Sequence, residues 1–391
     1  MVLDTPGALK VSPFMRWYSS WNTAELRWLR MPEQDLPELP GLAYAWGRPN
    51  ITGLIRETPA DFRVREQLRF EPTGAGEHWL IRIEKTNCNT LWVQSRLAEF
   101  AGVRPMDVGF AGMKDRRAVC EQWFSVLNPP GAAIAWQSLS LPGVRVLESA
   151  RHQRKLRRGK LEGNHFAIRI RGLEGDLDSL SEKLEIIAAE GVPNYFGRQR
   201  FGRNAANVEL AHRILSGERK RVSRQKRQFA LSAARSLIFN AVLARRVEND
   251  TWNRILDGDV AGLSGSRSIF CVEELTREIR LWEQRKDIHP TGPLWGTGEL
   301  LGRGHPRELE EQVSKKYLAL TNGLARERVK HGRRALRMMV DDLRWKLEGN
   351  DLKLECFLGP GGYATTLLRE LVNTSEPAEK LKEIEDDVRE N

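Results

Sequence analysis

A single carboxylate stands among cations in the stretch "GFAGMKDRRAVCEQWFSV", which covers residues 109–126. Asp115 follows Lys114 and precedes Arg116 and Arg117, at a turn between two apolar runs that read as strands. Cations on both sides would keep this carboxylate ionised, which suits a nucleophile or a general base. Aspartate is also common at turns that serve the fold alone, where it forms an ion pair. The charges of this stretch leave both interpretations open.

Two glycines precede this acid, at positions 109 and 112. Glycine has no Cβ, so a chain containing it can pass very close to another group. We therefore expect a close backbone approach just before Asp115.

A second stretch, "VPNYFGRQRFGRN" (192–204), interleaves aromatic rings with arginines on a loop that contains glycine. Rings of this kind stack on unpaired bases, and guanidinium groups grip phosphate in a fork. Arg198 and Arg200 are the candidate RNA-binding residues here. The aromatic residues of the loop could equally plug the protein core, and this stretch alone does not decide between the two.

Two shorter stretches supply further candidates. In "GNHF" (163–166), Asn164 can satisfy buried backbone groups, and Phe166 begins a strand, where a core phenylalanine is the commoner case.

The other short stretch is "RETPADFRVRE" (56–66), in which Pro-x-Asp predicts a turn into a strand that carries Phe62. Arg56 and Glu66 stand at its two ends, where they could support a site.

The overall charge favours a polyanionic partner. The 391 residues carry a formal net charge of +10, with a pI of about 9.6. Basic residues concentrate in three runs, 151–171, 219–227 and 326–337. One such run is usually a solvated helix face, but three of them in a basic protein favour nucleic-acid binding. The candidate phosphate contacts of the first run are Arg154, Lys155, Arg157 and Arg158.

Other classes of protein are disfavoured. The four cysteines lie far apart without a CxxC pair, so we expect neither a zinc site nor a disulfide framework. The first residues lack a signal-peptide pattern, and no segment has 18 apolar residues in a row. We predict a cytoplasmic protein with no membrane segment and no metal.

The hydrophobic pattern predicts strands first, then a helical block, then strands again. The predicted strands are 78–85, 108–111, 118–126, 165–172, 335–340, 343–349 and 352–359. The predicted helices are 89–102, 177–191, 230–248, 307–332 and 363–372. This order suggests one sheet domain interrupted by an inserted domain.

We accordingly divide the chain into five parts. They are an N-terminal extension (1–40), the first part of a catalytic domain (41–202), an inserted domain (203–332), the last part of the catalytic domain (333–375) and an acidic tail (376–391).

Taken together and in this order, the stretches resemble the TruD family of tRNA pseudouridine synthases, whose members modify uridine 13 of tRNA. The blocks that carry the resemblance are "TPADFRVRE", "GEHWLIRIEKTNCNT", "GFAGMKDRRAVCEQW", "RHQRKLRRGKLEGNHF", "GVPNYFGRQRFGRN", "LSAARSLIFN" and "GGYATTLLREL". The likeness runs from about residue 53 to residue 373. So many ordered blocks over most of a chain make chance similarity improbable.

The resemblance implies a fold and a set of site residues. The implied fold is α+β: a mixed, mainly antiparallel sheet flanked by helices, with an inserted family-specific α/β domain. The family's catalytic aspartate falls on Asp115, and its active-site phenylalanine falls on Phe166 with Asn164 beside it. The motif phenylalanine falls on Phe62, and the basic residue near the aspartate falls on Arg56.

The sequence departs from the family pattern at two places. Arg56 stands where lysine is often found, which keeps the charge but changes the hydrogen-bond geometry. Cys120 stands where threonine is usual, a change that roughly conserves volume. Neither departure removes the nucleophile.

The implied reaction converts uridine 13 of tRNA to pseudouridine, with Asp115 attacking either C1′ of the ribose or C6 of the uracil. It involves no redox change and no group carrier, so we expect no cofactor. Arg56 would orient Asp115, Phe166 would stack on the uracil, and Phe62, Lys114 and Arg116 would join the basic runs in binding the RNA. We expect a monomer whose partner is tRNA.

Two other functions were weighed. The basic runs and the loop at 192–204 would serve a non-catalytic RNA-binding or RNA-folding protein equally well, although such a protein does not need Asp115. A glycoside hydrolase needs two cooperating acids. Glu66 and Glu121 lack any pattern that would pair them with Asp115.

Overall fold

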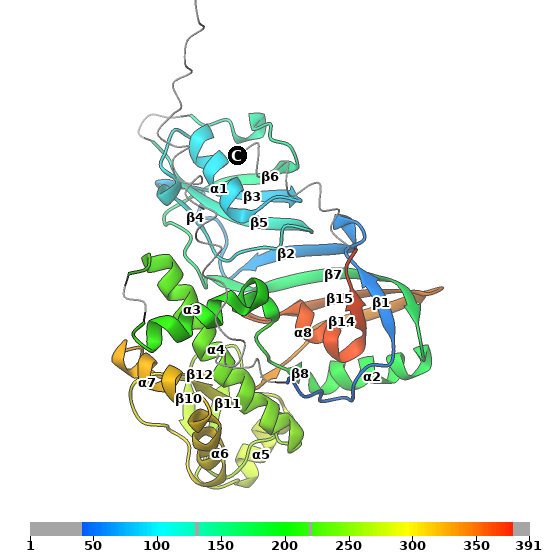
Figure 1. The fold of residues 1–391 in the computed structure, drawn as a ribbon. Coiled ribbons are helices and arrows are strands. Elements are labelled where there is room, and N and C mark those ends of the chain that lie inside the picture. Colours follow the sequence, from blue (N-terminus) through cyan, green and yellow to red (C-terminus); the bar gives the residue numbers. More distant parts are fainter. Residues whose placement is uncertain (1–40, 130–132, 219–220, 378–391) are drawn as a thin grey trace, which may run out of the picture. The chain divides into compact units, whose positions relative to one another are not determined.

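The computed structural model describes residues 41–129, 133–218 and 221–377, and its largest feature is a mixed β-sheet (Figure 1). Within these residues the sheet has ten strands, and its continuous order is β14-β15-β7-β2-β5-β3-β6. β1 pairs with β7 and β16, and β4 pairs with β5. The strands are β1 (Thr52–Ile55), β2 (Phe62–Leu68), β3 (His78–Thr86), β4 (Val108–Phe110), β5 (Val119–Leu127), β6 (Val144–His152), β7 (Leu161–Glu174), β14 (Asp341–Glu348), β15 (Asp351–Leu358) and β16 (Asn373–Ser375).

Most neighbouring strands of this sheet run antiparallel. The parallel pairs are β2 with β5 and β1 with β16. A parallel pair needs a crossover connection, and for β2 and β5 the chain between them forms β3, a helix and β4. The predicted mixed, mainly antiparallel sheet is therefore confirmed.

The two faces of the sheet differ, as strand alternation requires. Along β2, Phe62 and Val64 are buried on one face, whereas Arg63 and Arg65 are exposed on the other. Three helices cover the buried face: α1 (Thr90–Phe100) packs on β3 and β5, while α2 (Leu177–Glu190) and α8 (Ala364–Leu371) pack on β7 and β15. The expectation that helices flank the sheet is also confirmed.

A second group of elements lies between β7 and β14 in the chain. Its helices are α3 (Ala206–Leu215), α4 (Arg224–Glu248), α5 (Arg277–Gln284), α6 (Gly304–Lys315) and α7 (Leu318–Arg326). The described residues here also form a four-stranded sheet of order β10-β9-β11-β12 and a small sheet of β8 and β13. These strands are β8 (Val192–Pro193), β9 (Val260–Leu263), β10 (Ile269–Cys271), β11 (Ile288–Leu294), β12 (Gly332–Ala335) and β13 (Arg337–Met338).

The single helix predicted over 307–332 is wrong. Two helices, α6 and α7, occupy this range, and they are separated at Tyr317, which has φ −123° and ψ 34°. The break lets α7 pack against α3, where a Cβ added to Gly323 would lie 2.4 Å from the Cβ of Leu215. Packing against a neighbouring helix overrides the continuous helical pattern of the sequence.

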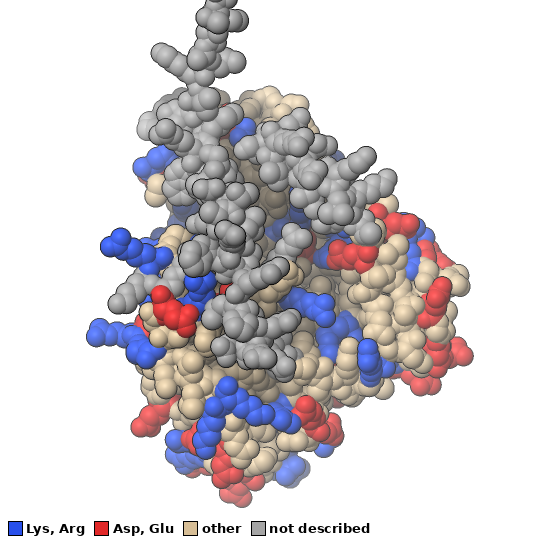
Figure 2. Space-filling model, in the orientation of Figure 1, with Lys and Arg blue, Asp and Glu red and all other residues tan. Residues whose placement is uncertain are grey.

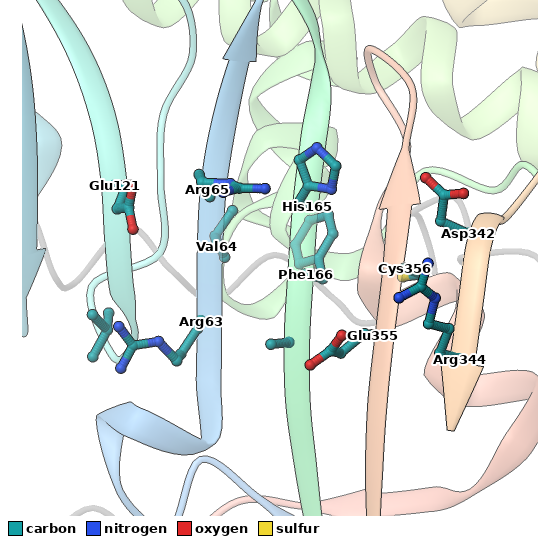
Figure 3. Close-up of a pocket in the computed structure, with 12 residues that line it drawn as sticks. Arg63, Val64, Arg65, Glu121, His165, Phe166, Asp342, Arg344, Glu355 and Cys356 are labelled. Atoms are coloured by element: carbon teal, nitrogen blue, oxygen red, sulfur yellow. The ribbon is translucent and has the colours of Figure 1, made fainter. Parts of the chain in front are cut away.

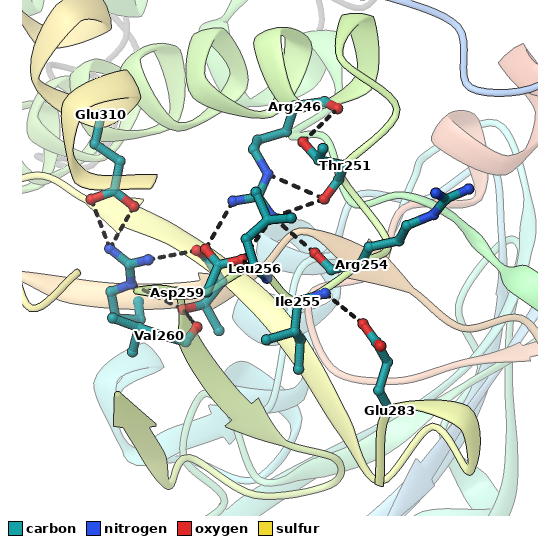
Figure 4. Close-up of polar contacts among 11 residues, drawn as sticks. Arg246, Thr251, Arg254, Ile255, Leu256, Asp259, Val260, Glu283 and Glu310 are labelled. Atoms are coloured by element: carbon teal, nitrogen blue, oxygen red, sulfur yellow. Dashed lines mark hydrogen bonds and ion pairs between the residues drawn. The ribbon is translucent and has the colours of Figure 1, made fainter. Parts of the chain in front are cut away.

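A buried ion-pair network ties α4 to the second sheet (Figure 4). The guanidinium of Arg246 grips Asp259 in a fork, with nitrogen–oxygen distances of 2.8 and 2.9 Å. The same group donates to the carbonyls of Thr251 and Arg254. Removing such charges from water is costly, and here the remaining donors find partners.

Among the described residues, every helix is too short or too polar to cross a bilayer. The predicted N-terminal extension and residues 378–391 of the predicted tail lie outside the described part of the chain.

A buried histidine joins β11 to β13. His289 is 8% exposed, and its Nδ1 accepts a hydrogen bond from Nε of Arg337 at 2.9 Å. Its Nε2 lies 2.8 Å from Oγ of Ser264. Burial, with a smaller effect from the charges of Arg337 and Lys286, lowers the pKa of His289 to about 4. The imidazole is therefore neutral in the folded protein near neutral pH.

This lowered pKa predicts a loss of stability in mild acid. Below about pH 6.5, His289 binds a proton in the unfolded chain but stays neutral in the folded protein. The free energy of unfolding therefore falls as the pH falls towards 4. Between pH 7 and pH 5 we expect the folded protein to lose about 2 kcal/mol from this residue. Urea unfolding of the wild type and of His289→Gln at both pH values measures the effect. An equal loss in both proteins would contradict it.

Candidate active site

Asp115 lies on the loop between β4 and β5, and both of its carboxylate oxygens have partners. Oδ2 accepts a hydrogen bond from Nη2 of Arg56 at 2.8 Å, and Oδ1 accepts one from Nε2 of Gln199 at 3.2 Å. The Asp115 side chain is nevertheless 35% exposed. The structure thus holds a partly exposed carboxylate in a fixed orientation.

Arg56 is the buried partner, with only 6% of its side chain exposed. Its guanidinium carbon lies 4.1 Å from the centre of the Phe62 ring, and its Nη1 lies 2.5 Å from Oε1 of Glu376. Its backbone has a φ of 55°, the left-handed region that non-glycine residues rarely adopt. Such a conformation costs about 1–3 kcal/mol and persists where the surroundings fix it.

Phe62 connects Arg56 to the other aromatic candidate. Its ring meets that of Phe166 edge to face, with centroids 6.1 Å apart. Asn164 is two residues before Phe166 on β7 and so lies on the same face of the sheet. Its Oδ1 is buried without a hydrogen-bond partner among the described residues. The structure therefore brings Asp115, Arg56, Phe62, Phe166 and Asn164 to one face of the sheet.

Buried polar side chains hydrogen-bond the backbone of the loop that carries Asp115. Nζ of Lys85, which is fully buried, donates to the carbonyl of Asp115 at 2.9 Å and to that of Cys88 at 2.7 Å. Gln122 donates to the carbonyl of Gly112 at 2.7 Å. Sγ of Cys120 also lies 3.7 Å from the Asp115 carbonyl.

A buried ion pair fixes the residue before Asp115. Nζ of Lys114 lies 2.5 Å from Oε1 of Glu66, and their side chains are 7% and 0% exposed. Glu66 also accepts the backbone N–H of Trp123, and the N–H of Lys114 donates to Thr90. Burial raises the pKa of Glu66, an effect that the charge of Lys114 opposes. Lys114, which the sequence suggested for RNA binding, thus has its ammonium group in the interior.

Lys85, Gln199 and Glu376 were missed by the sequence reasoning. Lys85 could have been found, because it continues the buried alternation of Ile81 and Ile83 on β3 and is the charged member of that series. Gln199 and Glu376 carry no such signal, since only the folded chain brings them to Asp115 and Arg56.

The first basic run lies beside the segment that leads to Asp115. Gly159 donates its N–H to the carbonyl of Ala111, and Arg158 lies 5.7 Å from the centre of the Phe110 ring. The close approach expected at Gly109 is present, because a Cβ there would lie 2.3 Å from the carbonyl oxygen of Leu156. At Gly112 an added Cβ would meet only ordinary contacts.

The side chains of this run are mostly open to solvent. Arg154, Arg157 and Arg158 are exposed, whereas Lys155 is half-buried and donates to the carbonyl of Met106. The neighbour of Asp115, Arg116, is exposed as well.

The loop at 192–204 does not present its rings to solvent. Tyr195, Phe196 and Phe201 are all buried, in a cluster with residues of α3 and α4. Arg200 donates to the hydroxyl of Tyr363 at 2.7 Å and to Ser232 at 3.1 Å. The core-plugging interpretation therefore describes the three rings. Arg198 is exposed.

The third basic run is likewise used within the fold. Arg333 forms a buried pair with Glu310 at 2.9 Å, and Arg337 is 2% exposed. The guanidinium of Arg334 lies 4.2 Å from the centre of the Phe196 ring. These three of the run's six Lys and Arg side chains are therefore held within the fold, whereas Arg326, Arg328 and Lys330 are exposed.

A pocket of about 410 Å³ opens on the other face of the sheet (Figure 3). Arg63 and Arg65 line it and alternate along β2 with the buried Phe62 and Val64. Arg63 of β2 pairs with Glu84 of β3 at 3.4 Å, across the intervening strand β5. Charged side chains of both signs line it, and Phe62 lies on the opposite face of β2.

Figure 2 shows one face of the molecule, with Lys and Arg side chains across its middle and acidic side chains gathered along its right-hand edge.

No group of three or more His, Cys, Asp or Glu able to hold a metal ion occurs in the described ranges.

Comparisons with known proteins agree in pointing to one family. The family model described as tRNA pseudouridine synthase D (TruD) matches residues 39–225 and 217–371. A protein of Methylococcus capsulatus named tRNA pseudouridine synthase D is 46% identical over 339 residues, covering 86% of this chain and 96% of that protein. One of the same name from Aeromonas hydrophila is 42% identical, with the same coverage.

A solved structure shares the fold. A chain from Methanosarcina mazei assigned to tRNA pseudouridine synthase D superposes with a TM-score of 0.63 at 21% sequence identity, covering 86% of this chain and 98% of that one.

The Lys114–Glu66 pair should behave as a coupled unit in stability measurements. Glu66→Gln keeps the acceptor for Trp123 but leaves a buried ammonium without its counter-charge, so we expect a loss of about 3 kcal/mol in the free energy of unfolding. Lys114→Met should cost a similar amount. The double variant should lose clearly less than the sum, because no unpaired charge remains.

Urea unfolding of the four proteins gives the coupling energy. Asp107→Asn, in an exposed pair with Arg104, is the control and should leave the midpoint nearly unchanged. Additive losses at Glu66 and Lys114 would show that the two residues do not act as a pair.

Proposed function

The chain belongs to the tRNA pseudouridine synthase D (TruD) family, and from this premise we propose that it isomerises uridine 13 of tRNA to pseudouridine with Asp115 as the nucleophile. The observation that carries the proposal is the 2.8 Å ion pair between Asp115 and the buried Arg56, beside the rings of Phe62 and Phe166. It supplies a carboxylate of fixed orientation that is open to a substrate.

The reaction needs one such carboxylate. The bond between N1 of the uracil and C1′ of the ribose breaks, the base turns, and C5 joins C1′ while its proton leaves and N1 gains one. Asp115 attacks C1′ or C6 to start this sequence. Because nothing is oxidised or reduced and no group passes to a carrier, we propose that the reaction proceeds without a cofactor.

We propose that three residues keep the detached uracil in position. Phe166 stacks on the uracil, and Phe62 supports both Phe166 and Arg56. The amide of Asn164 has an unsatisfied, buried oxygen among the described residues. Buried polar groups are normally hydrogen-bonded. We propose that this amide hydrogen-bonds the polar edge of the base.

The substrate must present its uridine outside the base stack, which costs a few kcal/mol. We propose that phosphate contacts from exposed arginines offset this cost, chiefly Arg116, Arg154, Arg157, Arg158 and Arg198. Lys155, which follows Arg154 on the loop between β6 and β7, joins them. Lys114 and Arg200 are given structural roles instead, because Glu66 and Tyr363 hold their charged groups.

The division of the chain into domains, its oligomeric state and its place in the cell belong to the same proposal. We propose that residues 41–202 and 333–375 form the catalytic domain, that the insertion at 203–332 contacts the tRNA, and that a monomer acts in the cytoplasm, where tRNA is found.

The nucleophile can be tested directly. We expect Asp115→Asn to lower tritium release from tRNA carrying 5-tritiated uridine by more than about a thousandfold, because the amide is a far weaker nucleophile. Binding of the tRNA, measured by filter retention, should change less than about threefold.

A transcript with cytidine at position 13 is the control, and it should release no tritium above background from that site. Normal turnover by Asp115→Asn would refute the nucleophile. Full activity on the cytidine-13 transcript would refute the position.

Arg56 is expected to act through its contact with Asp115. Arg56→Met removes the donor to Oδ2, so kcat should fall by at least about a hundredfold. Arg56→Lys restores a cation that can reach one carboxylate, and it should retain activity within about tenfold of the wild type. If both variants lost the same activity, the charge of Arg56 would not be what Asp115 requires.

A further inference from the structure

Glu376 places a second carboxylate beside the candidate active site. Its Oε1 lies 2.5 Å from Nη1 of Arg56, and its Oε2 lies 4.0 Å from Nη1 of Arg117. Arg117 is further held by a hydrogen bond to the carbonyl of Pro377 at 3.5 Å. The carboxylate of Glu376 therefore lies between the guanidinium of Arg56, which contacts Asp115, and that of Arg117, which follows Asp115 by two residues.

The sheet explains why this residue is there. β16 pairs in parallel with β1, with Ser375 opposite Leu54. Glu376 follows Ser375, and Arg56 follows Ile55 at the end of β1, so the two side chains meet where the parallel strands end. The matched family ranges end at residue 371, and Glu376 lies beyond them.

Glu376 is far more exposed to solvent than Arg56, the residue that it contacts. Arg56 is 6% exposed and is fixed by Asp115 and Phe62, whereas Glu376 is 42% exposed. The carboxylate of Glu376 is thus the outermost member of the cluster and can leave without disturbing the Arg56–Asp115 pair. Arg56 also keeps one buried donor, Nε, without a partner among the described residues.

Two guanidinium groups around one anion form the arrangement that proteins use for phosphate as well as carboxylate. A nucleotide that brings its sugar to Asp115 carries a phosphate on each side of that sugar. Groups that bind an anion beside Asp115 are therefore placed to meet one of these phosphates.

We propose that Arg56 and Arg117 form a binding site for a backbone phosphate of the nucleotide that enters beside Asp115, and that Glu376 occupies this site in the RNA-free protein. This inference rests on the proposed function, because it takes tRNA as the ligand. The tRNA must displace the carboxylate, and the ion pairs that Glu376 loses are subtracted from the affinity for RNA.

The test is Glu376→Gln in the full-length protein. Removing the competing charge should lower the Kd for an unmodified tRNA transcript by about threefold to tenfold, with kcat unchanged or higher. The control is Glu348→Gln, which makes the same change in net charge. Glu348 pairs with Lys346 and Lys353 at the β14–β15 turn, and its loss should alter Kd by less than the loss of Glu376.

The alternative outcomes overturn the proposal. If Glu376 orients Arg56 for catalysis, Glu376→Gln would lower kcat while leaving Kd unchanged. If it has no role at the site, both variants would show the same Kd. Arg117→Ala supplies a second measurement. This variant should bind the tRNA transcript more weakly than the wild type. In the double variant, Glu376→Gln should lower the Kd by a smaller factor than it does in the wild-type background.

Binding is measured on the cytidine-13 transcript, which cannot be isomerised, so it does not depend on turnover. Failure of the proposed function would appear separately, as wild-type protein that forms no pseudouridine on the uridine-13 transcript.

Discussion

The candidate site depends on a loop whose backbone is satisfied from inside the protein. The carbonyls of Gly112 and Asp115 accept hydrogen bonds from Gln122 and Lys85, and the N–H of Lys114 donates to Thr90. A surface loop would normally leave such groups to water. Buried partners instead fix the path of the chain, so that the Asp115 side chain projects from a rigid base while remaining partly exposed. The cost is a set of buried charges, of which Lys114 and Glu66 neutralise each other.

Arg56 performs the corresponding task from the other side. Its guanidinium stacks on Phe62, holds Asp115 with one nitrogen and binds Glu376 with the other. A lysine could make one of these contacts at a time, whereas the planar guanidinium makes all three together. This explains how a departure from the pattern expected of the family is accommodated, and it links Asp115 to the end of the described chain.

Local patterns in the sequence predicted much of this structure, because they report which face of a strand or helix is buried. The strands around Asp115, helices α1, α2 and α8, and the close approach at Gly109 all follow from alternation, helical spacing or the lack of a Cβ. Charge patterns were less informative. The sequence could not show that Lys114 and Arg333 point inward or that the rings at 195, 196 and 201 are buried, because partners distant in sequence determine both. Gln199 and Glu376 reach the site only through the tertiary fold.

The central claim is that one carboxylate, Asp115, makes pseudouridine at a single position of tRNA. The most direct measurement maps pseudouridine at nucleotide resolution in total tRNA from cells with and without this protein. The account predicts that the modification disappears at position 13 of a subset of tRNAs, and that it returns with the wild-type chain but not with Asp115→Asn. Unchanged modification at position 13, with losses confined to messenger or ribosomal RNA, would contradict it.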